Sequence, residues 1–192
     1  MQKTDVRLDL EQLKESIFKK FHRSTDVDLE KVGLELELFP FAANGDDRPI
    51  PADITTDNGN GTFELILKDI QQNSGPFSAS DDESLLTFDS TAGGNITFEP
   101  GGQIEYSSSS RHDVRSAIIE MTENVNKISD ILSKKGISLF HGAINPWYGV
   151  SEIGLKMRKP RYRAMDRYMN SVGPYGQQMM RLSASLQVNL DF

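Results

Sequence analysis

The sequence predicts an α+β fold in which helices cover one face of an antiparallel sheet. Three segments alternate apolar and polar residues with a period of two, which is typical of half-buried strands. These segments are Lys31–Phe39, Ile96–Tyr106 and Leu182–Leu190. Long connections with helical spacing of apolar residues separate them, and this favours an antiparallel layer over parallel βαβ units.

Composition narrows the classes of function. The 192 residues carry a net charge of −7 with a pI near 5.0, which argues against a general nucleic-acid binder. The chain has no cysteine, so thiolate metal sites, thiol nucleophiles and disulfides are excluded within it. No signal-peptide core or membrane-length apolar run is present, so we expect no membrane partner and a cytoplasmic location.

Helical patterns occupy four parts of the sequence. Apolar spacing predicts a helix over about residues 7–22 and another around Phe63–Ile70. The longest helix is expected to start at a capping box of Ser110 and Asp113 and to end near Gly136. Its expected buried stripe is Val114, Ala117, Ile118, Met121, Val125, Ile128 and Leu132. A fourth helix is expected to begin at Pro160, with an inner face of Met165, Tyr168 and Met169.

Several shorter strands complete the predicted sheet. Ser84–Asp89 and Asn95–Phe98 form an expected hairpin, and Ile137–His141 is a further strand. The first long strand should end before Pro40, which cannot donate a backbone hydrogen bond. Because the sequence ends within a patterned strand, which would leave an open edge, we expect residues 1–192 to be the N-terminal portion of one longer domain.

Four glutamates are predicted to stand on polar strand faces. Glu35 and Glu37 lie on the same side of one strand, about 7 Å apart. Glu99 and Glu105 flank a turn made by Pro100-Gly101-Gly102, where glycine permits positive φ. Gln103 should share their side of the sheet, away from the apolar residues.

These residues suggest a metal–phosphate site. Carboxylate and amide oxygens suit Mg²⁺ or Mn²⁺, which often bridge to phosphates. Taken singly, each glutamate is better explained as a solvent-facing residue of a one-sided sheet. A late Q-x-N strand and a basic cluster favour the metal–phosphate site. The cluster consists of Lys156, Arg158, Lys159, Arg161 and Arg163.

Other catalytic classes have less support. The sequence lacks the P-loop, the dinucleotide fingerprint and the nucleophile elbow. A glycosidase that uses paired carboxylates stays open in principle. Four strand-borne acids and a basic cluster nevertheless exceed what that mechanism needs.

The longest motifs resemble those of a known family. G-L-E-L-E at 33–37 and T-F-E-P-G-G-Q-I-E at 97–105 come first in the chain. K-P-R-Y-R-A-M-D-R-Y-M at 159–169 and G-Q-Q-M-M-R-L-S-A-S-L-Q-V-N-L-D at 176–191 follow. From Val32 to Phe192 the sequence is therefore similar to glutamate–cysteine ligases of the plant and proteobacterial type, including actinobacterial relatives in ergothioneine synthesis.

The resemblance implies an enzyme that joins the glutamate γ-carboxylate to the cysteine amine with ATP, through γ-glutamyl phosphate. The product, γ-glutamylcysteine, would serve glutathione or ergothioneine-type thiol synthesis. The implied partners are glutamate, cysteine and ATP. The implied fold is an antiparallel sheet curved into a polar funnel, related to the glutamine synthetase catalytic fold.

The resemblance also assigns roles by position. The implied metal ligands are Glu35, Glu37, Glu99 and Glu105; the implied catalytic residues are Lys159, Arg161 and Arg181; and the implied nucleotide contacts are Gln103, Gln187 and Asn189. Pro160 departs from the small residue found in many members, and family members are longer. A ligase for another amine and a non-catalytic binding relative remain as alternatives.

Overall fold

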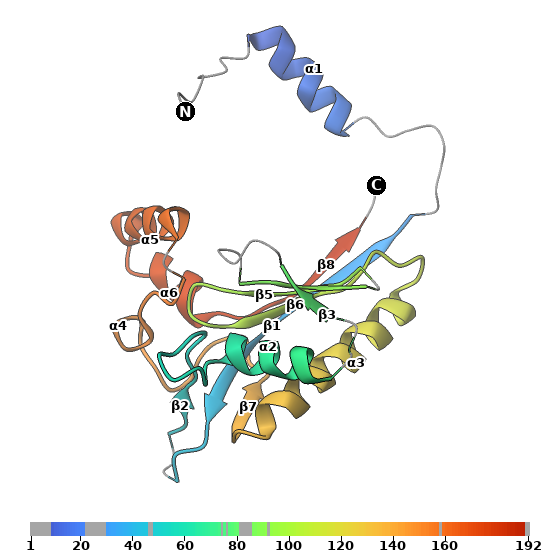
Figure 1. The fold of residues 1–192 in the computed structure, drawn as a ribbon. Helices are drawn as coiled ribbons and strands as arrows, with labels where there is room; N and C mark the ends of the chain where they lie inside the picture. The colour runs from blue at the N-terminus through green and yellow to red at the C-terminus, as the bar shows by residue number, and fades with distance from the viewer. Residues whose placement is uncertain are drawn as a thin grey trace, which may run out of the picture.

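A computed structural model describes residues 9–21, 30–45, 48–73, 75, 77–80, 86–91, 93–157 and 159–190. In these residues eight strands form one antiparallel sheet, with helices packed beneath it (Figure 1). The strands are β1 (Val32–Ala42), β2 (Ile50–Pro51), β3 (Phe77–Ala79), β4 (Phe88–Ser90), β5 (Asn95–Phe98), β6 (Ile104–Ser107), β7 (Ile137–Phe140) and β8 (Leu186–Leu190). The helices are α1 (Leu10–Phe21), α2 (Thr62–Gln72), α3 (Val114–Ser133), α4 (Val150–Ile153), α5 (Pro160–Val172) and α6 (Gly176–Leu182).

Strand β1 is the centre of the sheet. Its first half pairs with β6 and β8, and its second half pairs with β7 and β2. Beyond β6 the order continues through β5 and β4 to β3, and every one of these pairings is antiparallel. The predicted α+β class with an antiparallel sheet is therefore confirmed. None of the described helices is both long and apolar enough to cross a membrane.

The prediction that the first strand ends before Pro40 is wrong, since β1 continues to Ala42. The Pro40 carbonyl accepts a hydrogen bond from the Ala52 amide at 2.9 Å. The nitrogen and oxygen of one strand residue point toward the same neighbour, so the missing donor of Pro40 faces the two-residue strand β2. Proline is tolerated in a strand where its nitrogen faces such a short partner.

The apolar core lies between the sheet and helices α2 and α3, as the sequence predicts (Figure 1). Ile96 and Phe98 of β5 and Ile104 and Tyr106 of β6 are each at most 1% exposed. Burial of such a side chain stabilises the fold by about 1.5–3 kcal/mol. The same alternation directs Thr97 and the acidic residues to the opposite face.

Helix α3 starts later than expected, although Ala117, Val125, Ile128 and Leu132 of its predicted stripe are buried as expected. Asp113, rather than Ser110, is the N-cap, and its carboxylate accepts from the Ser116 amide at 2.8 Å. Val114 and Ile118 were expected to be buried, but they are 53% and 47% exposed.

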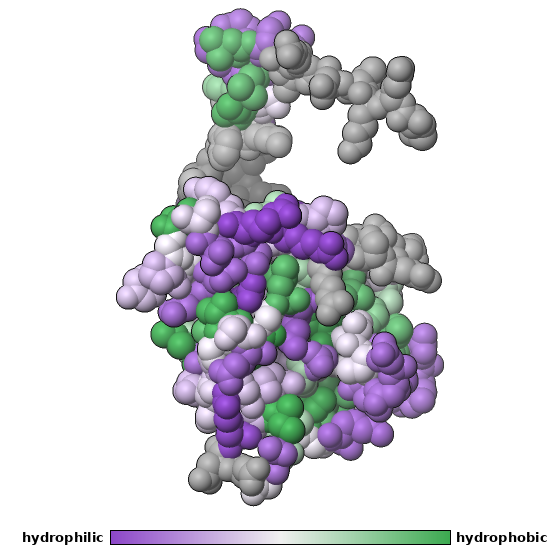
Figure 2. Space-filling model, turned by 90° about the vertical axis from the view of Figure 1, so that its left-hand side faces the viewer, coloured by the Kyte–Doolittle hydropathy of each residue, from purple (hydrophilic) through white to green (hydrophobic). Residues whose placement is uncertain are grey.

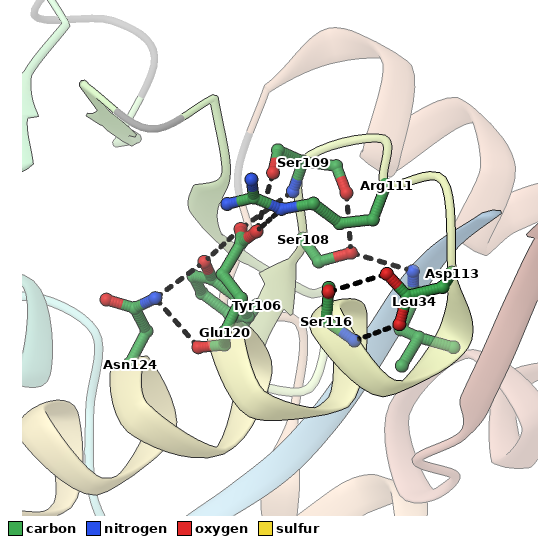
Figure 3. Close-up of polar contacts among 9 residues, drawn as sticks. All are labelled: Leu34, Tyr106, Ser108, Ser109, Arg111, Asp113, Ser116, Glu120 and Asn124. Atoms are coloured by element: carbon green, nitrogen blue, oxygen red, sulfur yellow. Dashed lines mark hydrogen bonds and ion pairs between the residues drawn. The ribbon is translucent and has the colours of Figure 1, made fainter. Parts of the chain in front are cut away.

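A buried polar network lies beside the apolar stripe of α3 (Figure 3). The Glu120 carboxylate, 7% exposed, accepts from the Tyr106 hydroxyl at 2.9 Å, the Ser109 amide at 2.8 Å and Arg111 Nε at 2.6 Å. The Asn124 amide donates to the Tyr106 hydroxyl at 2.9 Å. Burial raises the pKa of Glu120, but these donors outweigh it and hold the pKa below its usual value. Burial, and then the bond to Glu120, raises the pKa of Tyr106.

The C-terminal third differs most from expectation. The predicted strand Leu182–Leu190 is divided, because Leu182 ends α6 and β8 begins at Leu186. In α5, Tyr162 is buried, whereas Met165 and Tyr168 of the predicted inner face are 40% and 64% exposed. The expected hairpin of β4 and β5 is present, although Ser84 and Leu85 lie outside the described residues.

Candidate active site on the polar face of the sheet

The polar face carries two rows of side chains across the strands. In one row Glu37 of β1 lies directly opposite Glu105 of β6, which lies opposite Thr97 of β5. In the other row Glu35 lies opposite Gln187 of β8. Directly opposed residues have Cβ atoms about 4.5–5.5 Å apart. The register therefore brings together acidic residues that are far apart in the sequence.

Hydrogen bonds fix three of these carboxylates. Glu35 Oε1 accepts from Asn189 Nδ2 at 2.9 Å, and Glu105 Oε1 accepts from the Thr97 hydroxyl at 2.8 Å. Glu37 Oε2 accepts from the Ser185 backbone amide at 2.8 Å, just before β8 begins. The carboxylates are thus held by groups on β5, on β8 and just before β8.

The fourth carboxylate, Glu99, lies at the turn between β5 and β6. The Glu99 amide donates to the Gln103 carbonyl at 2.9 Å, and the Gly102 amide donates to the Glu99 carbonyl at 2.8 Å. Gly102 adopts φ +92°, which side chains rarely allow. Gly101 is needed for space, because a Cβ there would lie 2.1 Å from the Arg181 carbonyl oxygen. The turn therefore requires both glycines, for different reasons.

The acidic residues perturb one another. Burial, followed by the negative charges of Glu105 and Glu37, raises the pKa of Glu99 to about 7, although Arg161 opposes the shift. The pKa of Glu37 is also raised, first by burial, with contributions from Glu105 and Glu35 against the hydrogen bond from Ser185. A nearby cation would relieve this repulsion.

A cavity of about 230 Å³ joins the acidic face to α5. Glu99 and Glu105 line it from the sheet, and Lys159 and Arg161 line it from the start of α5. Pro160 occupies the first turn of α5, as predicted, and Lys159 is the N-cap. The helix N-terminus adds partial positive charge to the basic side of the cavity. Acidic and basic groups thus face one small space.

The basic residues are available to a ligand. Neither Lys159 nor Arg161 forms an ion pair with a carboxylate among the described residues. The Arg161 guanidinium instead lies 4.5 Å from the centre of the buried Tyr162 ring. Arg158 of the predicted cluster lies outside the described residues, and Lys156 pairs with Asp53.

The chemistry of the acidic face fits a hard divalent cation, because carboxylate oxygens are the ligands that Mg²⁺ and Mn²⁺ prefer. Burial and the charges of Glu105 and Glu37 raise the pKa of Glu99, and Arg161 offsets only part of this shift. The carboxylates do not converge, however: in the part of the chain that the structure describes, no three acidic or histidine side chains are grouped closely enough to hold an ion.

Comparison with known proteins identifies the family to which the chain belongs. A model described as glutamate-cysteine ligase family 2 (GCS2) matches residues 31–192. The chain belongs to this family. The resemblance inferred from the four motifs is therefore confirmed.

Plant enzymes are among the family relatives. A chloroplastic glutamate–cysteine ligase of Solanum lycopersicum is 29% identical over 167 residues, which cover 84% of this chain and 29% of the relative. Chloroplastic enzymes of Nicotiana tabacum and Oryza sativa subsp. japonica (ligase A) are each 33% identical over 98 residues, which cover 51% of this chain. These 98 residues cover 19% and 20% of the two relatives. The chain spans less than a third of the length of these ligases.

Two residues with predicted roles are buried in structural contacts. Arg181, on α6, donates to Asp166 of α5 and to the Val150 carbonyl oxygen, the latter at 3.1 Å. Gln103 is 2% exposed, and its Nε2 donates to the Ser183 carbonyl at 2.7 Å, while its Oε1 is buried without a partner. The Gln103 side chain holds Ser183, just after α6, against the turn that carries Glu99. The Arg181 side chain instead holds α6 against α5 and α4. Catalytic and nucleotide-contact roles for these two residues stay predictions.

The remaining nucleotide-contact candidates lie on β8. Gln187 and Asn189 are both exposed on the polar side, and Gln187 Nε2 donates to the Ser185 hydroxyl at 3.1 Å. They share the polar face with Glu35 but do not line the 230 Å³ cavity.

The structure adds site residues that sequence patterns did not single out. Thr97 positions Glu105, Ser185 binds Glu37, and Thr87 and Tyr162 line the cavity. Thr97 was detectable, because it alternates with Ile96 and Phe98 on the polar side of a predicted strand. Ser185 acts through its backbone, so no side-chain pattern could have indicated it.

Proposed function

We propose that the full-length protein is an ATP-dependent ligase that joins the γ-carboxylate of glutamate to the amine of cysteine. The observation that carries this proposal is the cavity in which Glu99 and Glu105 face Lys159 and Arg161. Membership of the family and the names of the plant relatives support it. We also propose that residues 1–192 form the N-terminal part of one catalytic domain.

The acidic face is the proposed site for Mg²⁺ or Mn²⁺. Glu35, Glu37, Glu99 and Glu105 would hold the ions, and the raised pKa of Glu99 is the physical reason to expect a cation there. When bound, the metal would neutralise charge on the ATP phosphates. Without a cation, four carboxylates would repel a triphosphate. Thr97, Ser185 and Asn189 would keep three carboxylates oriented before substrate arrives.

The basic side of the cavity is the proposed anchor for substrate anions. The planar guanidinium of Arg161 can bind a carboxylate or phosphate through two parallel hydrogen bonds. The ammonium of Lys159 supplies a mobile point charge at the N-terminus of α5. Together they would hold either the transferring phosphoryl group or a glutamate carboxylate against the sheet.

The proposed reaction has two steps. A γ-carboxylate oxygen of glutamate attacks the γ-phosphorus of ATP, ADP leaves, and γ-glutamyl phosphate forms. The cysteine amine then attacks the activated carbonyl carbon, phosphate leaves, and the nitrogen loses a proton to give the amide. Lys159 and Arg161 would stabilise negative charge on the phosphoryl oxygens in both steps.

Other predicted residues take supporting places in this proposal. Gln187 and Asn189 would contact the nucleotide from β8, with Asn189 also orienting Glu35. Gln103 would act by positioning the Glu99 turn, and Arg181 by positioning α5, rather than by touching substrate. The product would enter thiol synthesis of the glutathione or ergothioneine type in the cytoplasm. The plant relatives, by contrast, are named chloroplastic.

Activity of the full-length protein tests the proposal. Glutamate, ATP and Mg²⁺ are incubated with cysteine or with a panel of other amines, and ADP and the amide product are measured. We expect γ-glutamylcysteine with cysteine and loss of ADP formation in the Glu99→Ala variant. Preference for another amine would reassign the acceptor, and tight glutamate binding without ADP formation would indicate a non-catalytic relative.

A further inference from the structure

The helix layer beneath the sheet leaves β8 bare. Leu186, Val188 and Leu190 are 60%, 56% and 62% exposed. The strand register places them on the same face as Leu34 of β1, which is buried against Ala117 of α3. A helix about 10 Å wide covers roughly two strands spaced 4.8 Å apart. Helix α3 covers β1 and β6, and among the described residues no helix covers the neighbouring strand β8.

The exposed flank of α3 borders this bare strand. Glu120 faces Tyr106 of β6, so residues on the opposite flank of the helix turn toward β8. Val114 and Ile118 occupy that flank and are 53% and 47% exposed. We call the combined apolar surface the β8 patch; it consists of Val114, Ile118, Leu186, Val188 and Leu190.

Helix α1 has an exposed apolar face that could pack against the β8 patch. Leu10, Leu13 and Ile17 follow helical spacing and are 65%, 44% and 49% exposed. The helix lies apart from the rest of the described structure, with hydrophobic side chains visible on its surface (Figures 1 and 2). The opposite face carries the ion pair of Glu15 and Lys19 at 2.9 Å. A 12-residue helix is only marginally stable alone in water, so its apolar face needs a partner.

The connection between α1 and β1 allows this contact within one chain. Ten residues, 22–31, separate Phe21 from Val32, and Val32 pairs with Leu190 at the end of the β8 patch. Ten residues span at most about 33–36 Å, and a 12-residue helix is about 18 Å long. So short a tether gives an effective concentration in the millimolar range, which favours docking within the chain over exchange between copies.

We propose that α1 docks on the β8 patch through Leu10, Leu13 and Ile17, beside α3, as the next helix of the layer beneath the sheet. The docking itself does not depend on the proposed ligase activity. The functional consequence of docking does depend on that activity. Strand β8 carries Asn189, which orients Glu35, so α1 on the apolar face of β8 would stabilise one wall of the candidate active site.

Cross-linking tests the contact directly. The 192 residues contain no cysteine, so pairs can be introduced cleanly into full-length protein from which any other cysteine has been replaced. The test pair is Ile17→Cys with Val188→Cys, and the matched control is Glu15→Cys with Val188→Cys, joined by a short bismaleimide. We expect the test pair to cross-link within one chain about tenfold faster than the control.

The other outcomes overturn the proposal. Equal rates would show that α1 has no preferred face toward β8. A covalent dimer would show exchange between copies. Protection of the Val188→Cys thiol in both variants, without cross-linking, would show that another part of the protein covers β8.

Hydrogen exchange gives an independent measurement. Ile17→Asp places a charge on the apolar face of α1, and Glu15→Asp is the control on its polar face. We expect the amides of Leu186–Leu190 to exchange about tenfold faster in Ile17→Asp than in the control. Unchanged exchange in Ile17→Asp would contradict docking even if the charged variant folds normally.

Discussion

Glu37 and Glu105 face each other directly across β1 and β6, and both raise the pKa of Glu99 at the adjoining turn. Like charges opposed across a sheet are destabilising unless a ligand or cation compensates them. The like charges of the polar face therefore repel one another beside the cavity of the candidate active site.

The first prediction follows from this repulsion. In metal-free protein, Glu105→Gln removes the largest charge effect on Glu99, so the pKa of Glu99 should fall from about 7 toward 4.5. NMR titration of the Glu99 carboxyl carbon measures the change. Asp89→Asn, at the exposed middle position of β4, serves as a control for the general loss of one negative charge. An unchanged pKa in Glu105→Gln would mean that the charge of Glu105 does not contribute to the shift.

The second prediction concerns stability against pH without metal. Folded Glu99 keeps its proton up to about pH 7, whereas the unfolded residue loses it near 4.5. The folded state binds more protons between these values, so the free energy of unfolding should decrease as pH rises through that window. Glu99→Gln removes the decrease and should raise the free energy of unfolding at pH 8 by about 1–2 kcal/mol, after allowing for solvent screening.

Urea unfolding of metal-free full-length protein at pH 5 and pH 8 measures this effect. The variant should gain stability at pH 8 and little at pH 5, while losing the proposed activity. A variant that is less stable than the unmodified protein at pH 8 would argue against charge repulsion at this turn.

How far the sequence predicts the site depends on the range of the interactions. Alternation correctly places Glu35, Glu37 and Glu105 on one face, because side-chain direction in a strand is a local property. It cannot show that Gln103 is buried under Ser183, since that contact joins residues 80 positions apart. Similarly, the sequence suggests that Arg181 is a further cation available to substrate, whereas in the structure it forms an ion pair with Asp166 of α5.

The same distinction applies to the fold. Most of the predicted stripe of α3 is buried, but the apolar spacing does not indicate the buried network of Glu120, Tyr106 and Asn124, which links the helix to β6. Helix α6 was missed, because Leu182 and Ala184 continue the alternation of the strand that follows. In both helices the outcome depends on tertiary contacts, which the local pattern of apolar and polar residues does not indicate.

The third prediction tests the network beneath the sheet. Glu120→Gln should lower the free energy of unfolding at pH 7 by about 2–4 kcal/mol, because it leaves Arg111 without its buried partner. Since the folded pKa of Glu120 is lowered, its contribution is complete above about pH 4.5 and is lost as pH falls through the folded pKa.

Chemical denaturation at pH 7 and pH 3 measures the difference. Glu123→Gln, exposed on the same helix, is the matched control and should change stability by less than about 0.5 kcal/mol. If Glu120→Gln behaves like this control, the network does not contribute to folding.

The fourth prediction addresses the basic side of the cavity. Arg161→Lys keeps the charge but removes the planar pair of donors, so activity should fall about 10–100-fold if Arg161 binds a carboxylate or phosphate through two hydrogen bonds. Arg163→Lys, two residues further along α5 and outside the cavity lining, is the control. Steady-state rates against glutamate and ATP show which substrate is affected. Equal activity in both variants would limit Arg161 to a general electrostatic role.

The last prediction concerns the glycine turn. Gly101→Ala places a methyl group 2.1 Å from the Arg181 carbonyl oxygen, so either the turn or the end of α6 must move. Because Glu99 begins this turn, we expect proposed ligase activity to fall at least about 100-fold, since a displacement near 1 Å has that cost in a positioned site. Gly173→Ala meets no atom within 4 Å and is the matched control. Activity assays with circular dichroism separate a displaced site from an unfolded protein. Full activity in a folded Gly101→Ala variant would show that the turn tolerates displacement and that Glu99 does not depend on close packing against α6.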